Sequence, residues 1–449
     1  MDIRVTEQVT RTRSRLRRQQ LRAIFEEFDG KLMKLDREAR VEKYRIMAQS
    51  PFSFYRGSAY LFYFDVTQEW FPFHTTAGRP TWIQGDLHFE NFGAFRTRTG
   101  GIQYDVNDFD EGYLGSYLYD LLRMAVSIAL VGDMKGMSAE EQEKLVHIYI
   151  KAYSKQIRRF AKGEDDPASF LMNEERAKGP VKRLLRKLHK RQEGHLLEKI
   201  TAVMLDSTRQ FQDTDELVEP TPEEREQLLA AWPGYVESIA DHSRWTPEHY
   251  TIKDIAVKRG SGTASIGLNR YYVLIEADAA VEGEGPEDIV LEVKEVRVPV
   301  PAYFMPFSES FWGAFGHQGK RVVQTQQAMH HAADPYLGCL TIGGRDYYVR
   351  ERSPYKKRLR LDSLEAAADL GSVLKTMGRI TAKIHARADK DLEDGMLSYH
   401  SEREILYAMG PDEESFCHYV AGWALSYADV VKEDYRLFME WSQRRRAQK

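Results

Sequence analysis

Two stretches decide how this chain is interpreted: Gln84-Gly-Asp-Leu-His-Phe-Glu-Asn91 and Tyr104-Asp-Val-Asn-Asp-Phe-Asp-Glu111. Each carries its polar residues directly after a predicted strand. Asp86 and Asn91 stand five positions apart across one tight loop, and Asp108 follows 17 residues after Asn91. Transfer of a phosphoryl group needs a carboxylate near the acceptor hydroxyl and oxygen ligands that hold Mg²⁺ on the nucleotide phosphates. The spacing therefore predicts Asp86 as a base and Asn91 and Asp108 as metal ligands.

The patterns around these stretches indicate helix on both sides of a β-rich block. Apolar residues recur at helical spacing over most of 1–50, over 117–160 and from 363 onward, whereas strand patterns dominate 251–298. A predicted hairpin turns at Gly343–Gly344. We therefore expect a β-rich block of roughly 100 residues set between two helical blocks.

The composition limits the class of protein. Of 449 residues, 42% are apolar, and the formal net charge of -4 is nearly balanced. This balance argues against a nucleic-acid coat protein or an acidic disordered protein. The chain has no apolar run long enough to span a membrane, and its basic N-terminus lacks the apolar segment of a signal peptide. Cys339 and Cys417 make no metal-binding spacing, so we expect reduced thiols and a cytoplasmic location.

A second constellation lies in the β-rich block. A glycine-rich turn there runs into a predicted strand, Asn269–Ile275, which favours the phosphate flap of kinases over a dinucleotide fold. Its candidate nucleotide-binding residues are Gly260, Gly262, Ser265 and Gly267. Lys294 stands in an apolar run, where an unpaired ammonium group is costly, so we expect a nucleotide phosphate beside it. The alternative is a lysine that reaches solvent from an edge strand.

The two opening stretches resemble the catalytic loop and the metal-binding loop of aminoglycoside phosphotransferases and related small-molecule kinases. By this resemblance Asp86 takes the catalytic-base position, Asn91 a metal-ligand position and Asp108 the metal-binding Asp position. Gln84 stands where those kinases usually carry His. Asp120 resembles the buried helix Asp that braces the catalytic loop from behind, and its alternative is an ordinary helix carboxylate.

Further residues take supporting roles. His88 is expected to bond backbone within the catalytic loop, and Asp110 belongs to the metal-binding stretch. Arg56 and Arg350 are candidates for contact with phosphate or substrate, and for each the alternative is an arginine that braces a loop.

Two features of the nucleotide side rest on the comparison with protein kinases. There the strand lysine pairs with a Glu on the next helix. The helix predicted over 320–329 offers only glutamines, of which Gln326 is expected to orient Lys294 by a weaker hydrogen bond. Tyr348 and Val349, in a hinge-like segment, are expected to bind the nucleotide.

These parts follow one another in an unusual order. Kinase-like folds place the flap, the lysine and the hinge before the catalytic loop, whereas here the loop at 84–91 comes first. The helix predicted over 370–386 resembles the one that normally leads into that loop. We therefore expect an α+β, two-lobed protein-kinase-like fold that is circularly permuted. The expected domains are a β-rich nucleotide lobe at 246–355, inserted in a mostly helical catalytic lobe made of 1–245 and 356–449.

The chain also resembles a bacterial domain-of-unknown-function family, number 2252, through Ser50–Gly57, Gly85–Gly93, Asn107–Glu111 and Val293–Glu295. Together the resemblances imply an ATP- and Mg²⁺-dependent phosphotransferase, with Mn²⁺ as an alternative metal. We expect its partners to be a nucleotide and a small-molecule acceptor of unknown identity, without nucleic acid or membrane. No pattern indicates an oligomeric state.

Three other functions stay open. The same fold serves for AMP transfer, and a pseudokinase would bind a nucleotide without turnover. A metal-dependent phosphoesterase would use Asp86, His88, Asp108 and His74, but the sequence lacks the flanking ligand motifs of such two-metal sites.

Overall fold

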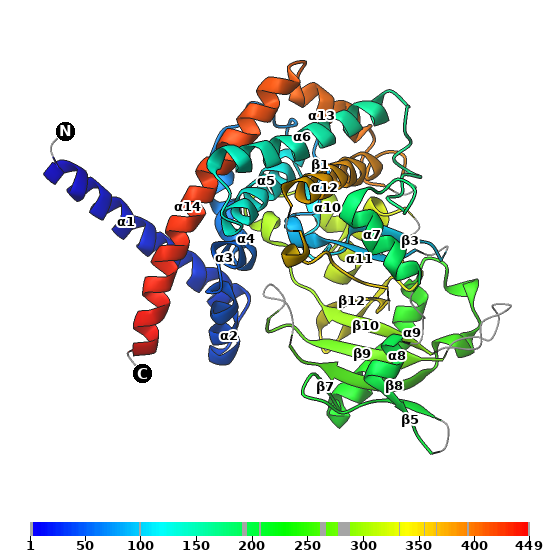
Figure 1. Cartoon of the computed structure of the whole chain (residues 1–449). Coiled ribbons are helices and arrows are strands. Elements are labelled where there is room, and N and C mark those ends of the chain that lie inside the picture. The colour runs from blue at the N-terminus through cyan, green and yellow to red at the C-terminus, as the bar shows by residue number, and fades with distance from the viewer. Residues whose placement is uncertain are drawn as a thin grey trace.

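The computed structural model describes residues 3–97, 100–190, 195–205, 208–260, 266–276, 288–331, 333–353, 355–364, 366–392 and 395–447. These residues form a mixed α+β fold, in which a large helical part lies beside an antiparallel sheet (Figure 1). No described helix is long and apolar enough to cross a membrane.

The helical part is built from both ends of the chain. Its N-terminal helices are α1 (Ile3–Phe25), α2 (Arg37–Met47), α3 (Pro51–Gly57), α4 (Ala59–Val66), α5 (Tyr117–Met134), α6 (Ala139–Ala161) and α7 (Gly179–His189). Its C-terminal helices are α12 (Ala367–Arg387), α13 (Ser401–Met409) and α14 (Glu413–Ala447). Since α14 packs on α5 and α6 and crosses α1, the two chain ends lie on the same side of the molecule (Figure 1).

The main sheet is antiparallel, with the strand order β11-β12-β10-β9-β8-β7. Its strands are β7 (Leu217–Val218), β8 (Ile252–Lys258), β9 (Arg270–Ile275), β10 (Ile289–Glu295), β11 (Gly338–Ile342) and β12 (Arg345–Glu351). The helices next to it are α8 (His195–Ile200), α9 (Pro222–Ser238) and α11 (Gln318–Met329), whereas α10 (Glu309–Ala314) packs through Phe311 against Trp82 and Tyr113. Two-stranded pairs are formed by β1 (Thr81–Ile83) with β4 (Tyr113–Gly115), β2 (Phe92–Arg96) with β3 (Ile102–Val106), and β5 (Thr201–Val203) with β6 (Arg209–Phe211).

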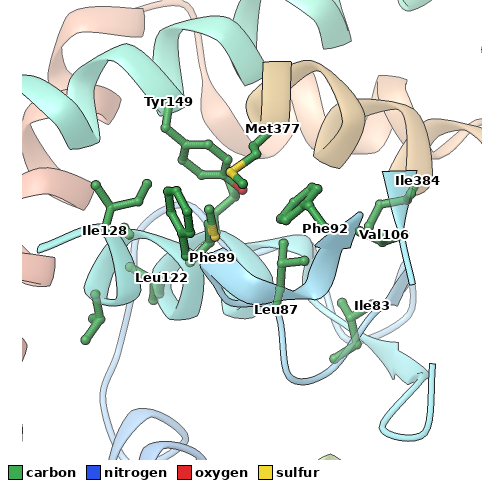
Figure 2. Packing of buried hydrophobic residues seen from close by; sticks show 14 of the residues in the cluster. Ile83, Leu87, Phe89, Phe92, Val106, Leu122, Ile128, Tyr149, Met377 and Ile384 are labelled. Carbon is green, nitrogen blue, oxygen red and sulfur yellow. The ribbon is translucent and has the colours of Figure 1, made fainter. Parts of the chain in front are cut away.

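The largest apolar core fills the helical part and holds the segment after β1 in place. Leu87 and Phe89 of that segment are 0% and 2% exposed. Figure 2 shows the rings of Phe89 and Phe92 pointing toward Tyr149 of α6 and Met377 of α12. The apolar residues of this segment therefore anchor it in the core, so its polar residues between them are held in fixed positions.

A separate apolar core lies on one face of the main sheet. There Trp232 and Tyr235 of α9 pack with Val273 of β9 and Val293 of β10. Because neighbouring residues of a strand point to opposite faces, Lys294 projects from the other face of the sheet.

The sequence patterns located most of these elements. The strand predicted at Ile102–Val106 is β3, and the hairpin predicted at Gly343–Gly344 joins β11 to β12. The aromatic stretch 51–73 forms α3 and α4, where buried residues surround the helix and leave no amphipathic stripe. Strand β7 and helix α9 belong with the main sheet, although both precede residue 246 in the sequence. The β-rich part therefore begins earlier than the expected boundary at residue 246.

A buried ion pair ties α12 to β3. Lys383 Nζ lies 2.6 Å from Asp105 Oδ2 and 2.7 Å from the main-chain oxygen of Met329, and both charged side chains are 1% exposed. Burial lowers the pKa of Lys383 and raises the pKa of Asp105, as expected for charges taken out of water. The pair therefore fixes α12 and the end of α11 against β3, the strand that leads to Asp108.

Removal of one partner of this pair should be costly. We expect Lys383→Met to lower the free energy of unfolding by about 3–5 kcal/mol, because Asp105 is left as an uncompensated buried charge. Chemical denaturation measures the loss. The double variant Lys383→Met/Asp105→Leu should regain much of it, and a double variant as unstable as the sum of the two single variants would contradict the pairing.

Candidate active site

Asp120, on the first turn of α5, holds the loop that follows β1. Its carboxylate accepts hydrogen bonds from the main-chain N–H groups of Gln84 (2.6 Å) and Gly85 (3.0 Å). On its other side, His385 Nε2 of α12 lies 3.2 Å from the carboxylate, and His385 Nδ1 lies 2.9 Å from the hydroxyl of Tyr153. Since an ionised carboxylate only accepts, the Nε2 atom carries the proton. Asp120 is thus the brace that the sequence indicated.

Gly85 is required by the backbone of this loop. Its φ is +87°, and a Cβ atom there would lie 2.0 Å from the main-chain oxygen of Glu111. The carbonyl of Gly85 accepts a 2.6 Å hydrogen bond from the hydroxyl of Tyr63. The glycine lets the loop after β1 lie directly against Glu111, at the end of the stretch Tyr104–Glu111, and a larger residue would prevent this close approach.

Asp86 is buried against a positive charge. The Nε atom of Arg123, on α5, donates a 2.6 Å hydrogen bond to its carboxylate, and Arg123 itself is 0% exposed. Burial raises the pKa of Asp86 above its ordinary value, although Arg123 and Arg56 oppose the shift. Asn91 closes the loop because its Nδ2 donates to the main-chain oxygen of Asp86 at 3.1 Å, which leaves Oδ1 as its acceptor atom. A cation is the partner that such an oxygen suits.

The two predicted loops are joined by hydrogen bonds. Gln84 Nε2 donates to the main-chain oxygen of Asp108 at 2.7 Å, and Gln84 Oε1 accepts from the main-chain N–H of Asp86 at 2.9 Å. The N–H of Asn107 donates to the main-chain oxygen of Asn91 at 2.8 Å. These hydrogen bonds hold the loop of Asp86 and Asn91 against the segment of Asp108, and the side chain of Gln84 bonds to both.

The carboxylate of Asp108 stands among cations. Within the described ranges it makes no hydrogen bond and no ion pair closer than 4 Å, in contrast to Asp86. Burial alone would raise the pKa of Asp108, but the positive charges of Lys294, Arg350, Arg358 and Lys356 outweigh it and lower the pKa. An ionised carboxylate without a hydrogen-bond donor is available to a metal ion.

Lys294 reaches the same place from the main sheet. It is 3% exposed, and its ammonium group forms an ion pair with Asp110. Strand β10 lies between β12 and β9, so Lys294 does not reach solvent from an edge strand. Gln326 does not orient it as expected, because Gln326 Oε1 has no hydrogen-bond partner among the described residues. The partner of Lys294 is thus a carboxylate from the stretch Tyr104–Glu111, and not a side chain of the helix.

The other residues expected to bind a nucleotide fall into two groups. Gly260 and Gly267 have positive φ values of 69° and 78°, whereas Gly262 and Ser265 lie outside the described residues. Tyr348 and Val349 are 1% and 0% exposed and sit in the middle of β12, paired with both β10 and β11. Their main-chain groups are used by the sheet, so they do not form a hinge for a base.

A cleft of about 620 Å³ opens beside the two loops. Its acidic residues are Asp86, Asp108, Asp110, Glu111, Glu295 and Asp346. The opposite wall comes from the π-helical turn Glu26–Leu32 and the residues after it, with Phe28 and Lys34, and from Gly267 at the end of the glycine-rich turn. Residues of the helical part, of the stretch Tyr104–Glu111 and of the glycine-rich turn therefore line the same cleft. Its acidic wall suits a divalent cation.

Arg56 and His88 contact each other beside the catalytic loop. Arg56 Nε lies 3.3 Å from His88 Nε2, and Arg56 also pairs with Glu90 at 2.5 Å. Burial, together with neighbouring arginines, lowers the pKa of His88 well below its ordinary value, so the ring is neutral. His88 Nδ1 accepts from the main-chain N–H of Glu90 at 3.2 Å, in agreement with its expected role within the loop.

His74 does not join these residues. It packs among aromatic rings, 5.3 Å from Phe71 and 5.0 Å from Tyr119 between ring centroids, and burial lowers its pKa to about 4. Two other groups among the described residues bring possible metal-ligand atoms within 4.8 Å of one another: Asp389, His400 and Glu402, and His147, Glu414 and His418. Asp108 lines the cleft, and Asn91 is held next to it by the hydrogen bond between the two loops.

Three features of the site were missed by the sequence interpretation. Arg123 follows Asp120 by three positions, a spacing that puts both on one face of α5, and this signal was available. Arg321 of α11 donates to the main-chain oxygens of Asp110 and Gly112, but nothing in its sequence environment marks it. The third is the basic run from Arg350 to Arg360.

Glu111 provides a test of the electrostatics in the cleft. It accepts a hydrogen bond from the N–H of Val300, and burial raises its pKa to about 7, with Asp86 and Asp110 adding to the shift. A carboxyl group whose pKa is raised in the folded state binds more protons there, so stability falls as pH rises from about 4.5 to about 7.

We expect Glu111→Gln to remove this part of the pH dependence. The parent protein should lose about 1–3 kcal/mol more than the variant between pH 4.5 and pH 7, and the two curves should run parallel above that range. Denaturation at a series of pH values measures the difference. Parallel curves throughout would show that Glu111 titrates at its ordinary pKa.

Comparison with known proteins adds a family but no activity. A search of curated proteins and a search of solved structures each returned no match. Residues 35–441 match the bacterial family described as "Uncharacterized protein conserved in bacteria (DUF2252)". Because this match spans most of the 449 residues and includes both loops of the site, the chain belongs to the DUF2252 family.

Proposed function

We propose that this protein is an ATP- and Mg²⁺-dependent phosphotransferase that acts on a small-molecule acceptor. The observation that carries the proposal is the convergence of four residues from distant parts of the chain. Asp86, Asn91 and Asp108 are held together by loop hydrogen bonds, and the buried Lys294 reaches them through Asp110. These are the four side chains that phosphoryl transfer requires.

Each residue has a role that follows from its surroundings. Asn91 Oδ1 and the carboxylate of Asp108 would hold the magnesium ion, which neutralises phosphate charge when bound. Asp86 accepts the proton of the acceptor hydroxyl, since burial keeps its pKa raised and Arg123 fixes its orientation. Lys294 donates to the nucleotide phosphates in place of Asp110. The 620 Å³ cleft has the size of a small-molecule site.

The contacts of α12 support a permuted kinase-like fold. In the related kinases the equivalent helix runs directly into the catalytic loop, whereas here that loop is encoded far upstream. His385, near the end of α12, nevertheless bonds Asp120, the residue that holds Gln84 and Gly85. The helix end and the loop therefore meet in space although they are apart in sequence, which is what a circular permutation produces.

One observation favours AMP transfer as a second candidate function. In protein kinases a helix Glu positions the strand lysine. Here the partner of Lys294 is Asp110, beside the metal ligand Asp108. Because Lys294 is positioned by Asp110 and not by a helix glutamate, it contacts a different phosphate of the nucleotide from the one that it would contact in a kinase. The same residues then serve nucleotidyl transfer.

Asp108 should control binding of the nucleotide. We expect Mg²⁺-ATP to raise the melting temperature of the parent protein, because a ligand at about 100 times its Kd adds about 2.7 kcal/mol to stability. Asp108→Ala should lose most of that rise, while its melting temperature without ligand stays near that of the parent. Thermal denaturation with ATP, with Mg²⁺ and with both measures the effect. A rise that survives the substitution would contradict Asp108 as a metal ligand.

Asp86 should control turnover rather than binding. The informative variant is Asp86→Asn, because its Oδ1 still accepts from Arg123, whereas alanine would leave a buried arginine unpaired. We expect it to keep the Mg²⁺-ATP shift and to lose activity by about 100-fold or more. Mass spectrometry of metabolite pools after incubation, read as a gain of phosphate or AMP, measures turnover. Full activity in this variant would exclude Asp86 as the base.

A further inference from the structure

A short basic segment lies against the metal site. We call it the cationic strap and define it as Tyr355, Lys356, Lys357 and Arg358. Its backbone pairs with β2, with the N–H of Lys357 2.9 Å from the oxygen of Ala94 and the N–H of Ala94 2.8 Å from the oxygen of Lys357. The pairing begins just after Asn91, so the strap runs beside the predicted metal ligands.

The strap lies so close to β2 that it fills the space there. A Cβ atom on Gly93 would be 3.2 Å from the main-chain oxygen of Lys357 and 3.7 Å from Cγ of Arg358. In an extended pairing neighbouring side chains point to opposite sides. Lys356 and Arg358 share one side, and both lower the pKa of the Asp108 carboxylate, whereas Lys357 is not among the cations that do so; Lys356 is half-buried, and Lys357 and Arg358 are both exposed.

Two cations of the strap lack an anion. Among the described residues, neither the ammonium group of Lys356 nor the guanidinium of Arg358 has a hydrogen-bond acceptor or an ion pair. Arg350 and Arg56 lie nearby but are already paired, with Glu292 at 2.7 Å and Glu90 at 2.5 Å. The strap thus adds positive charge that acts on Asp108 and Glu292 from a distance but has no direct anionic partner among the described residues.

Burial makes this arrangement costly. Burial, with the repulsion of Arg350 and Arg352 added, lowers the pKa of Lys356 well below its ordinary value. Beside Lys356 and Arg350 lies a small cavity of about 40 Å³, into which Asn107 brings a side chain that is 6% exposed and has no hydrogen-bond partner on either polar atom. An uncompensated ammonium next to an unsatisfied amide indicates a missing polar ligand.

We propose that Lys356 and Arg358 form a phosphate-binding subsite beside Asp108, separate from the residues that line the 620 Å³ cleft. The ligand is a phosphate group or a chain of phosphates, whose oxygens match a guanidinium and an ammonium. It comes either from the outer phosphates of the nucleotide or from a phosphate on the acceptor. This assignment of sources rests on the proposed function, whereas the binding of the anion does not.

The test uses inorganic tripolyphosphate as the probe. Calorimetric titration of the full chain without metal, in EDTA, should show binding. Lys356→Gln and Arg358→Gln should each weaken it by tenfold or more. Lys357→Gln is the matched control, because it removes the same charge from the same segment on the other side, and its affinity should stay within about twofold of the parent. Absence of binding, or equal losses in all three variants, would overturn the subsite.

Asp108→Ala separates this inference from the proposed function. Removal of a carboxylate beside the subsite should strengthen metal-free tripolyphosphate binding severalfold, whereas the same variant should lose Mg²⁺-ATP binding. A weaker affinity for tripolyphosphate in this variant would contradict the subsite. Retained Mg²⁺-ATP binding together with stronger tripolyphosphate binding would contradict only the metal role of Asp108.

Competition distinguishes the two sources of phosphate. Displacement of tripolyphosphate by Mg²⁺-ATP in the parent protein assigns the subsite to the nucleotide tail. Simultaneous binding of both assigns it to a phosphorylated acceptor. Both outcomes support the subsite. Loss of tripolyphosphate affinity for Lys356→Gln without change for Arg358→Gln would overturn the two-residue site.

Discussion

The carboxylate of Asp120 accepts two main-chain N–H groups from the loop after β1, and the ring N–H of His385 points at it from α12. It is completely buried, so these donors are the ones that compensate its charge. The contact unites three segments that are remote in sequence. Everything else in the site depends on it, because the loop it fixes carries the residue proposed as the base and one of the predicted metal ligands.

Around that brace the charges are distributed unevenly. Asp86 is paired directly with a buried arginine, whereas Asp108 has cations nearby but no direct partner among the described residues. Lys294 has its own carboxylate, Asp110. The residue expected to take a proton thus has a direct cationic partner, whereas the residue expected to hold a metal has none among the described residues. Such an arrangement suits a site that is completed by ligands.

Much of this could be read from the sequence. The loop residues Asp86, Asn91 and Asp108 were predictable because a tight loop and a neighbouring strand place short side chains at fixed positions. The mixed α+β class followed from the change of hydrophobic period along the chain. Asp120 was found by its resemblance to a bracing residue, and its contacts agree with that role.

The rest depended on packing between distant segments. Gln326 was expected to form a hydrogen bond with Lys294. The sequence could not show that Asp110, from a distant part of the chain, forms an ion pair with Lys294 instead. Tyr348 and Val349 resembled a hinge because their pattern is strand-like, and only the pairing with β11 and β10 shows that both edges of their strand are occupied. The basic run near Lys356 was visible, but its position beside β2 was not.

The most direct test is a crystal structure with Mg²⁺ and a non-hydrolysable ATP analogue. The account predicts a metal ion bound by Asn91 Oδ1 and the carboxylate of Asp108, with Lys294 Nζ on a phosphate oxygen. A nucleotide bound away from these three residues, or a metal ion that touches neither Asn91 nor Asp108, would contradict it.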